Sequence, residues 1–183
     1  MGPVGGTGRG MTVLAIDPGP EQSAYVLFEE GVLTAHGKEP NARMLALIGS
    51  HWPYVPVVFE QVASYGMPVG AEVFETVFWT GRMFEAVIQH VLYPGVSRMP
   101  RRDVKLHLCG QARAKDSNIR QALIDRFGGK DAAIGKKASP GPLYGLKADE
   151  WQALALAVTW HDLHGQVADG SAVTRIAQAI TPP

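Results

Sequence analysis

The sequence predicts one α/β domain built on a five-stranded mixed β-sheet flanked by helices. Three short strand-like segments come first, and helical and strand-like segments alternate after them. Two apolar runs end in acidic residues, Asp17 and Glu60, where a buried carboxylate is costly unless it has a partner. With 183 residues, the chain is long enough to bury the core of such a domain.

The first three strands are expected at Thr12–Asp17, Ser23–Phe28 and Gly31–His36. Each is short and rich in apolar residues, and the Glu-Glu-Gly segment at 29–31 is typical of a hairpin turn. The second and third strands should therefore pair antiparallel.

The middle of the chain continues with a helix, a strand, a long helix and a strand. Asn41 is the expected N-cap of the first helix, which ends before Pro53. The run Val55–Glu60 is continuously apolar up to its last residue, as in a central strand. A helix over Val69–Leu92 carries apolar residues three and four apart, and Val96–Met99 supplies the fifth strand.

The last third of the chain is expected to be mainly helical. Helices are predicted at Arg102–Leu108, at Ser117–Phe127 and from Asp149 to about His164, and a small one at Ser171–Ile180. The segment Gly128–Gly145 is rich in Gly, Lys and Pro, and we expect a mobile loop there.

Composition limits the class of protein. We place one domain over residues 11–165, preceded at 1–10 by a disordered leader or a remnant of cloning and followed at 166–183 by a tail. No apolar run approaches the roughly 20 residues that cross a membrane. Cys109 is the only cysteine, which suits a reducing cytoplasm.

The formal net charge of zero conceals an uneven distribution. Residues 98–147 hold 12 Lys and Arg against 4 Asp and Glu, whereas both flanking parts of the chain are acidic. A basic block of this kind is expected of a protein that binds a polyanion.

Three acidic residues, Asp17, Glu60 and Asp149, lie at the ends of strands or at the start of a helix. Adjacent buried carboxylates repel one another, and divalent cations reverse that penalty. Two Mg²⁺ ions can activate a water and stabilise the leaving oxygen in phosphodiester hydrolysis. We assign Asp17 as the bridging ligand, with Glu60 and Asp149 each holding one ion, although Asp149 alone could be a helix cap.

Four segments carry a resemblance to a known family: Ala15–Gly19, Phe59–Val62, Gly110–Ser117 and Ala148–Ala155. In order and spacing they resemble the RuvC-like Holliday junction resolvases, particularly small phage-type members, over residues 11–163. The resemblance implies a ribonuclease H-like fold and a homodimer that binds four-way DNA junctions. It also implies symmetrical cleavage with Mg²⁺ or Mn²⁺, in the cytoplasm of a bacterium or a phage-infected host.

One departure from the family pattern concerns the fourth metal ligand. The family places a carboxylate three residues after Asp149, where this chain has Gln152. Gln152 would share a helix face with Asp149 and offer a neutral oxygen. Glu150 lies roughly 100° away around the helix and is the other candidate. Both alternatives stay open at this point.

The resemblance also suggests DNA contacts. Lys115 matches a family residue near the cleaved phosphate, and Tyr65 and Met67 could replace the aromatic wedge whose family position holds Ala63. The residues expected to grip backbone phosphates are Arg101, Arg102, Lys105, Arg113 and Arg120. Lys136 and Lys137, with Lys130 and Lys147, could close over DNA or simply keep their loop soluble.

The long helix of the middle region is the expected dimer surface. The apolar stripe of the helix Val69–Leu92 is broader than one sheet face needs, and Gly81 permits a close partner helix, so we expect the dimer to form there. An actin-like sugar kinase or ATPase also begins with a strand and an Asp-Gly turn, but it needs two such domains, which 183 residues do not provide. A broader nuclease for flaps or branches and a non-catalytic junction-binding protein remain as alternatives.

Overall fold

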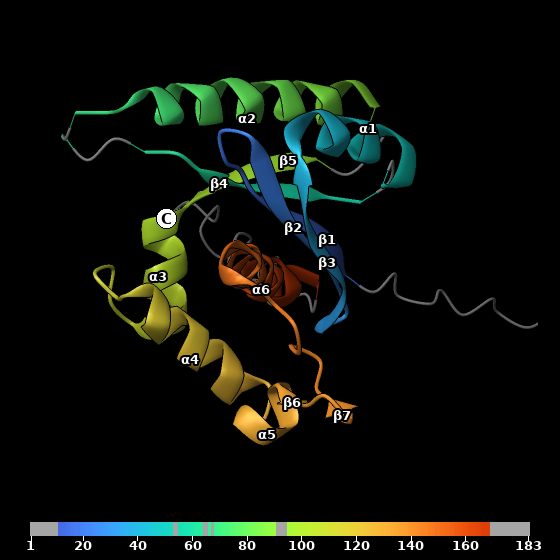
Figure 1. Cartoon of the computed structure of the whole chain (residues 1–183), viewed down its shortest axis with the longest axis vertical. Coiled ribbons are helices and arrows are strands. Elements are labelled where there is room, and N and C mark those ends of the chain that lie inside the picture. The colour runs from blue at the N-terminus through green and yellow to red at the C-terminus, as the bar shows by residue number, and fades with distance from the viewer. Residues whose placement is uncertain (1–10, 53–54, 64–65, 67, 91–94, 169–183) are drawn as a thin grey trace, which may run out of the picture.

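The computed structural model describes residues 11–52, 55–63, 66, 68–90 and 95–168. Its centre is a mixed five-stranded sheet with the order β3-β2-β1-β4-β5, flanked by helices on both faces (Figure 1). The predicted α/β architecture is therefore confirmed.

The three N-terminal strands are antiparallel and the other two are parallel to the first. β1 (Thr12–Asp17) pairs with β2 (Gln22–Glu29), which pairs with β3 (Val32–Pro40). β4 (Val57–Gln61) joins the other side of β1, and β5 (Val96–Pro100) joins β4. β1 and β4 are thus neighbours at the centre of the sheet.

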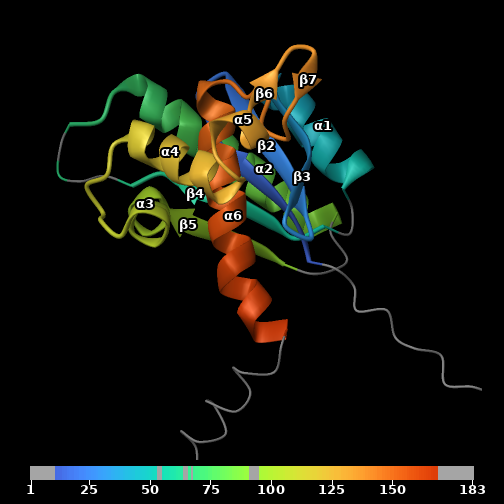
Figure 2. The ribbon, with the colours of Figure 1, turned by 90° about the horizontal axis from the view of Figure 1, so that it is seen from below.

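The helices lie in layers on the two faces of the sheet (Figures 1 and 2). They are α1 (Asn41–His51), α2 (Ala71–His90), α3 (Arg101–Cys109), α4 (Asp116–Arg126), α5 (Lys130–Ala133) and α6 (Ala148–Ala168). α1 and α2 cover one face, while α6 crosses the other with α3 and α4 beside it. None of the described helices is both long enough and apolar enough to cross a bilayer.

The alternation of β1 and β4 assigns their acidic residues to one face. Val13 and Ala15 pack in the core beneath α6, whereas Leu14 and Ile16 pack beneath α1 and α2. Because side chains alternate along a strand, Asp17 continues the row of Ala15 on the α6 face. In β4, Val58 packs on the same face, and Glu60 continues its row.

Asn41 is not an N-cap, contrary to the prediction. Pro40 holds that position, and Asn41 is the first residue of α1. The amide of Asn41 is buried, donates to the carbonyl of Gly19 at 2.9 Å and accepts from the Ser23 hydroxyl at 2.7 Å. These bonds tie the start of α1 to the turn that follows β1.

The segment Gly128–Gly145, predicted as a mobile loop, is structured. It contains α5 and a small antiparallel pair, β6 (Gly135–Lys136) and β7 (Ser139–Pro140). Ala133 and Leu143 are buried in the core beneath α6, and the Leu143 amide donates to the Ala133 carbonyl at 2.8 Å. Two apolar anchors therefore hold a segment whose composition suggested a loop.

Candidate functional site

The register of the central strands brings Asp17 and Glu60 together. Ile16 is the partner of Phe59 in the parallel β1–β4 pair. The next residue of each strand is acidic, and both side chains belong to the rows that face α6. Two carboxylates distant in sequence thus lie at the same edge of the sheet, where β1 and β4 end.

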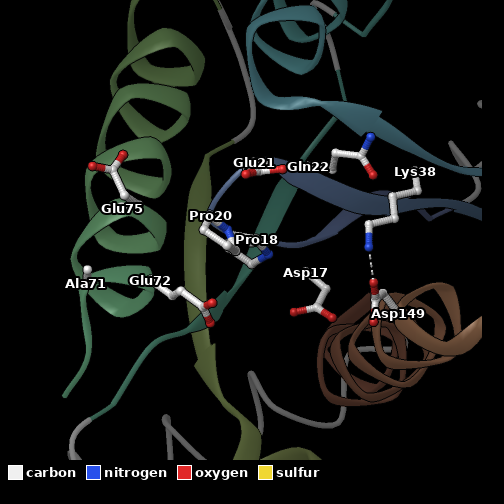
Figure 3. Close-up of a pocket in the computed structure, with 11 residues that line it drawn as sticks. Asp17, Pro18, Pro20, Glu21, Gln22, Lys38, Ala71, Glu72, Glu75 and Asp149 are labelled. Atoms are coloured by element: carbon white, nitrogen blue, oxygen red, sulfur yellow. Dashed lines mark hydrogen bonds and ion pairs between the residues drawn. The ribbon is translucent and has the colours of Figure 1, made fainter. Parts of the chain in front are cut away.

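Asp149 enters the same region from the first turn of α6. It forms an ion pair with Lys38 of β3 (Figure 3). Lys38 is opposite Ala24, which is opposite Asp17, so Lys38 and Asp17 belong to one row across three strands. The sequence prediction ended this strand at His36, and the longer β3 is what brings Lys38 to the site.

The charges in this region act strongly on Asp17. Burial raises the pKa of Asp17 to about 8, and the carboxylates of Glu60 and Asp149 add to the rise, while Arg101 and Lys38 oppose it. Burial also raises the pKa of Glu60, against the effect of Arg101. The charges of the other two predicted ligands, Glu60 and Asp149, therefore both act on Asp17.

Arg101 contacts two carboxylates at once. One guanidinium nitrogen, Nη1, donates to Glu60 Oε1 and Oε2 at 3.1 and 3.2 Å, and Nη2 is 2.9 Å from Asp116. Strand pairing explains why Arg101 lies beside Glu60. Gln61 pairs with Pro100, and Arg101 begins α3 directly after Pro100. Arg101 is thus engaged with acidic groups, although the sequence predicted a phosphate contact.

Glu150 and Gln152 differ in their surroundings. The buried Glu150 carboxylate is 3.0 Å from His36 Nδ1 and accepts from the Lys147 amide at 2.9 Å. Glu150 therefore lies against β3 and the helix start, away from Asp17. Gln152 lines a cavity together with Asp17 and Asp149, so of the two candidate fourth ligands only Gln152 borders the acidic group.

The turn after Asp17 is held by its own backbone. A side-chain Cβ at Gly19 would lie 2.5 Å from the Gln22 carbonyl oxygen, so this position requires glycine. Asn41 fixes the same turn through its bond to the Gly19 carbonyl. The sequence context of Asn41 is that of a helix cap, so nothing local indicates this supporting role.

Two open cavities meet at Asp17 and Asp149. The larger, of about 780 Å³, extends toward α2 and has Glu72 and Glu75 on its opposite wall (Figure 3). The second, of about 520 Å³, is bordered by Arg101, Arg120 and Gln152, among others. Asp17 and Asp149 therefore lie where an acidic hollow meets one that carries both acidic and basic side chains.

The donor set fits Mg²⁺ by its chemistry. Asp17, Glu60 and Asp149 supply hard carboxylate oxygens and Gln152 adds an amide, the ligand types that Mg²⁺ prefers. Within the described residues, no three His, Cys, Asp or Glu side chains converge closely enough to enclose a metal ion. Arg101 and Lys38 instead hold two of the carboxylates.

The remaining predicted DNA-binding residues surround this site to different degrees. Arg102, Lys105 and Arg113 line a further cavity with Arg101, and Arg120 lies 5.0 Å above the Trp151 ring. Lys115 is the exposed N-cap of α4, where its amide donates to Asn118. Lys136 and Lys137 are exposed at the β6–β7 hairpin. Tyr65 and Met67 lie outside the described residues.

Comparisons with known proteins support the fold. No protein-family model and no curated protein sequence matches the chain. Among solved structures, Thermus thermophilus RuvC is 18% identical with a TM-score of 0.58. T. thermophilus RuvC in complex with Holliday junction substrate is 16% identical with a TM-score of 0.59. Each match covers 86% of this chain and 96% of the other. At these identities the likeness shows a RuvC-type, ribonuclease H-like fold.

Proposed function

We propose that this protein is a structure-specific endonuclease that cleaves four-way DNA junctions by metal-assisted phosphodiester hydrolysis. The observation that carries the proposal is the placement of Asp17 and Glu60 side by side at one edge of the sheet, with Asp149 lining the same cavity as Asp17. The raised pKa of Asp17, about 8, agrees with this crowding of carboxylates. The RuvC neighbours, one of them bound to a Holliday junction, support the choice of substrate.

In this proposal Asp17 would help to hold both Mg²⁺ ions, and Glu60 and Asp149 would each hold one of them. Mn²⁺ could replace Mg²⁺. When bound, the ions supply an activated water and stabilise the leaving oxygen. Gln152, which borders the same cavity, contributes a neutral oxygen as the fourth ligand. The pair of Glu150 with His36 and the Lys147 amide argues against Glu150 in this role.

The basic residues around the cavities are proposed to hold the DNA arms. Arg102, Lys105 and Arg113 form one cationic hollow, and Arg120 borders the second cavity beside the acidic group. Their contacts with phosphates would give affinity that falls steeply with salt and carries no sequence information. The family resemblance alone supports the proposed DNA contacts of Lys115, Lys136, Lys137, Tyr65 and Met67. It is also the sole basis for proposing a phage-type member.

The second copy is proposed to dock on α2. Phe74, Val77, Phe78 and Ile88 are all more than half exposed on this helix, and a Cβ at Gly81 would meet no atom within 4 Å. Two opposed strands need two catalytic sites, so a dimer with an apolar interface fits the proposed reaction.

Cleavage assays test the proposal. Four-way junction, flap and linear duplex DNA are incubated with Mg²⁺, Mn²⁺ or EDTA and the wild type, Asp17→Asn or Asp103→Asn. We expect paired nicks in the junction alone, lost in EDTA and at least about 10²-fold reduced by Asp17→Asn, because an essential metal ligand is removed. The exposed Asp103 on α3 serves as the matched control and should have no effect.

Two results would redirect the proposal. Equal cleavage of flaps and junctions would indicate a broader branched-DNA nuclease. Tight junction binding without cleavage under any metal would indicate a binding protein, a function that the replacement of a family carboxylate by Gln152 favours.

A further inference from the structure

The acidic group carries two resident positive charges, and they contact different carboxylates. Arg101 pairs with Glu60, and Lys38 pairs with Asp149. The two cations come from elements on opposite sides of the site, α3 and β3. Each of the two carboxylates proposed to hold its own ion is therefore already paired with a basic side chain.

Arg101 differs from the other nearby cations in having a second carboxylate within reach. Its Nη2 is 2.9 Å from Asp116, which is 58% exposed at the first turn of α4, whereas Glu60 is 15% exposed. Lys105 approaches Asp116 only at 3.8 Å and makes no contact with Glu60. Among the basic side chains that the structure describes around the site, only Arg101 joins the largely buried Glu60 to the exposed Asp116.

A guanidinium and a divalent cation cannot share the Glu60 carboxylate without strong repulsion. Releasing Arg101 from Glu60 without a new partner would leave the charge of a partly buried side chain uncompensated, which is costly. Asp116 removes that cost, since it already binds the other nitrogen of the same guanidinium. The planar, forked arrangement of Arg suits such an exchange better than the single ammonium of Lys.

We propose that Arg101 is a displaceable counter-ion of Glu60, and that Asp116 is the positioning residue that retains Arg101 when a divalent cation takes Glu60. This inference rests on the proposed metal site. It predicts that the affinity for the cation depends on the transfer of Arg101 from Glu60 to Asp116, as well as on the net charge of the site. In the part of the chain that the structure describes, Lys38 forms an ion pair with Asp149 alone, so it acts there as a simple competitor.

The test measures Mn²⁺ binding to the whole protein without DNA, by electron paramagnetic resonance of free Mn²⁺ at constant ionic strength. Arg101→Gln should lower the Kd about tenfold, because the competitor for Glu60 is gone. Arg102→Gln removes the same charge from the exposed neighbouring position of α3 without freeing Glu60, and it should change the Kd by less than about threefold. Arg101→Lys should lower the Kd by less than Arg101→Gln, and it preserves the local charge if the Gln variant folds poorly.

A double-variant cycle isolates the role of Asp116. Asp116→Asn alone should raise the Kd, because the displaced Arg101 loses its alternative partner. In the Arg101→Gln background the same change should have little further effect, whereas a purely long-range charge effect would persist in both backgrounds.

The outcomes separate the inference from the proposed function. Mn²⁺ binding that is lost in Asp17→Asn but unchanged in Arg101→Gln would overturn the exchange and leave the metal site intact. Equal effects of Arg101→Gln and Arg102→Gln would also overturn it, in favour of net charge. Binding that is absent, or insensitive to Asp17→Asn, in every variant would overturn the metal site and the inference together.

Discussion

Asp17 is the residue at which stability and proposed function oppose each other. Its carboxyl lies at the end of a buried strand beside two other acids, and its pKa is raised to about 8. Between its ordinary value of 3.8 and about 8, the folded state holds a proton that the unfolded state has released. The free energy of unfolding must therefore fall as the pH rises through this window and level off above it.

Asp17→Asn should remove this slope, because the amide is neutral at every pH. In EDTA at pH 8 we expect the variant to be more stable than the wild type by about 2–5 kcal/mol, with the two converging near pH 4. Urea unfolding at several pH values measures the difference. Parallel profiles for the two proteins, with Asp103→Asn as a neutral control, would show that Asp17 ionises without penalty.

The sequence revealed the carboxylates of the site better than their cations. Asp17 and Glu60 each end an apolar run, and that placement is visible without coordinates. Arg101 and Lys38 reach the site through strand register, since Pro100 pairs with Gln61 and Lys38 with Ala24. Register depends on pairing between distant segments, and nothing local to either residue indicates its acidic partner.

At the scale of elements, α6 is fixed at both ends by polar contacts. Its first turn holds β3 through the pairs Asp149–Lys38 and Glu150–His36. Farther along, Asp162 accepts from Arg126 at 2.5 and 2.6 Å and lies 2.8 Å from His107. One carboxylate thus joins α6 to both α3 and α4.

Asp162→Asn should destabilise the protein by about 1 kcal/mol near neutral pH, a modest value because Arg126 is 44% exposed and the pair is screened by solvent. Although burial raises it, the bonds from Arg126 and His107 leave the pKa of Asp162 below its usual value. Its contribution is therefore present above the ordinary pKa of a carboxyl group and lost as the pH falls through the lowered value.

Thermal unfolding of Asp162→Asn at pH 7 and in acid checks this prediction. Asp125→Asn is the matched control, because the Asp125 side chain accepts a hydrogen bond from Gln121 of the same helix. A deficit that stays constant as the pH falls would assign the effect to packing rather than to the charge of Asp162.

Elements were predictable where an apolar pattern was long, and less so where a few residues anchor a segment. The strands and long helices follow from periodicity, and their order fixes the sheet. The segment 128–145 has a loop-like composition, yet Ala133 and Leu143 bury it against the core. Two apolar residues in a polar stretch give no periodic signal, so this local structure needs the tertiary contacts to be seen.

For the whole molecule, the proposed assembly uses the exposed apolar side chains of α2, while Glu72 and Glu75 of the same helix border the larger cavity at Asp17 and Asp149. The acids face α6 at one side of the sheet, while α1 and α2 cover the other side. On α2, Met83 and Val87 pack inward, and Phe74 and Phe78 are 65% and 56% exposed. Arg82 lies over the Phe78 and Trp79 rings, which orders part of this outer surface.

Phe78→Glu should therefore disrupt the proposed dimer without unfolding the monomer. The side chain is mostly exposed, so the folded monomer loses little, whereas a charge at the centre of an apolar interface is costly for association. Sedimentation at micromolar concentration should show a dimer for the wild type and a monomer for the variant, with at least about a tenfold weaker association. Junction cleavage should change from paired cuts to single, uncoordinated nicks. Ser50→Glu, a charge added on α1, provides the control. A wild-type monomer in sedimentation, or paired cuts by a monomeric variant, would contradict the assignment of α2 as the dimer surface.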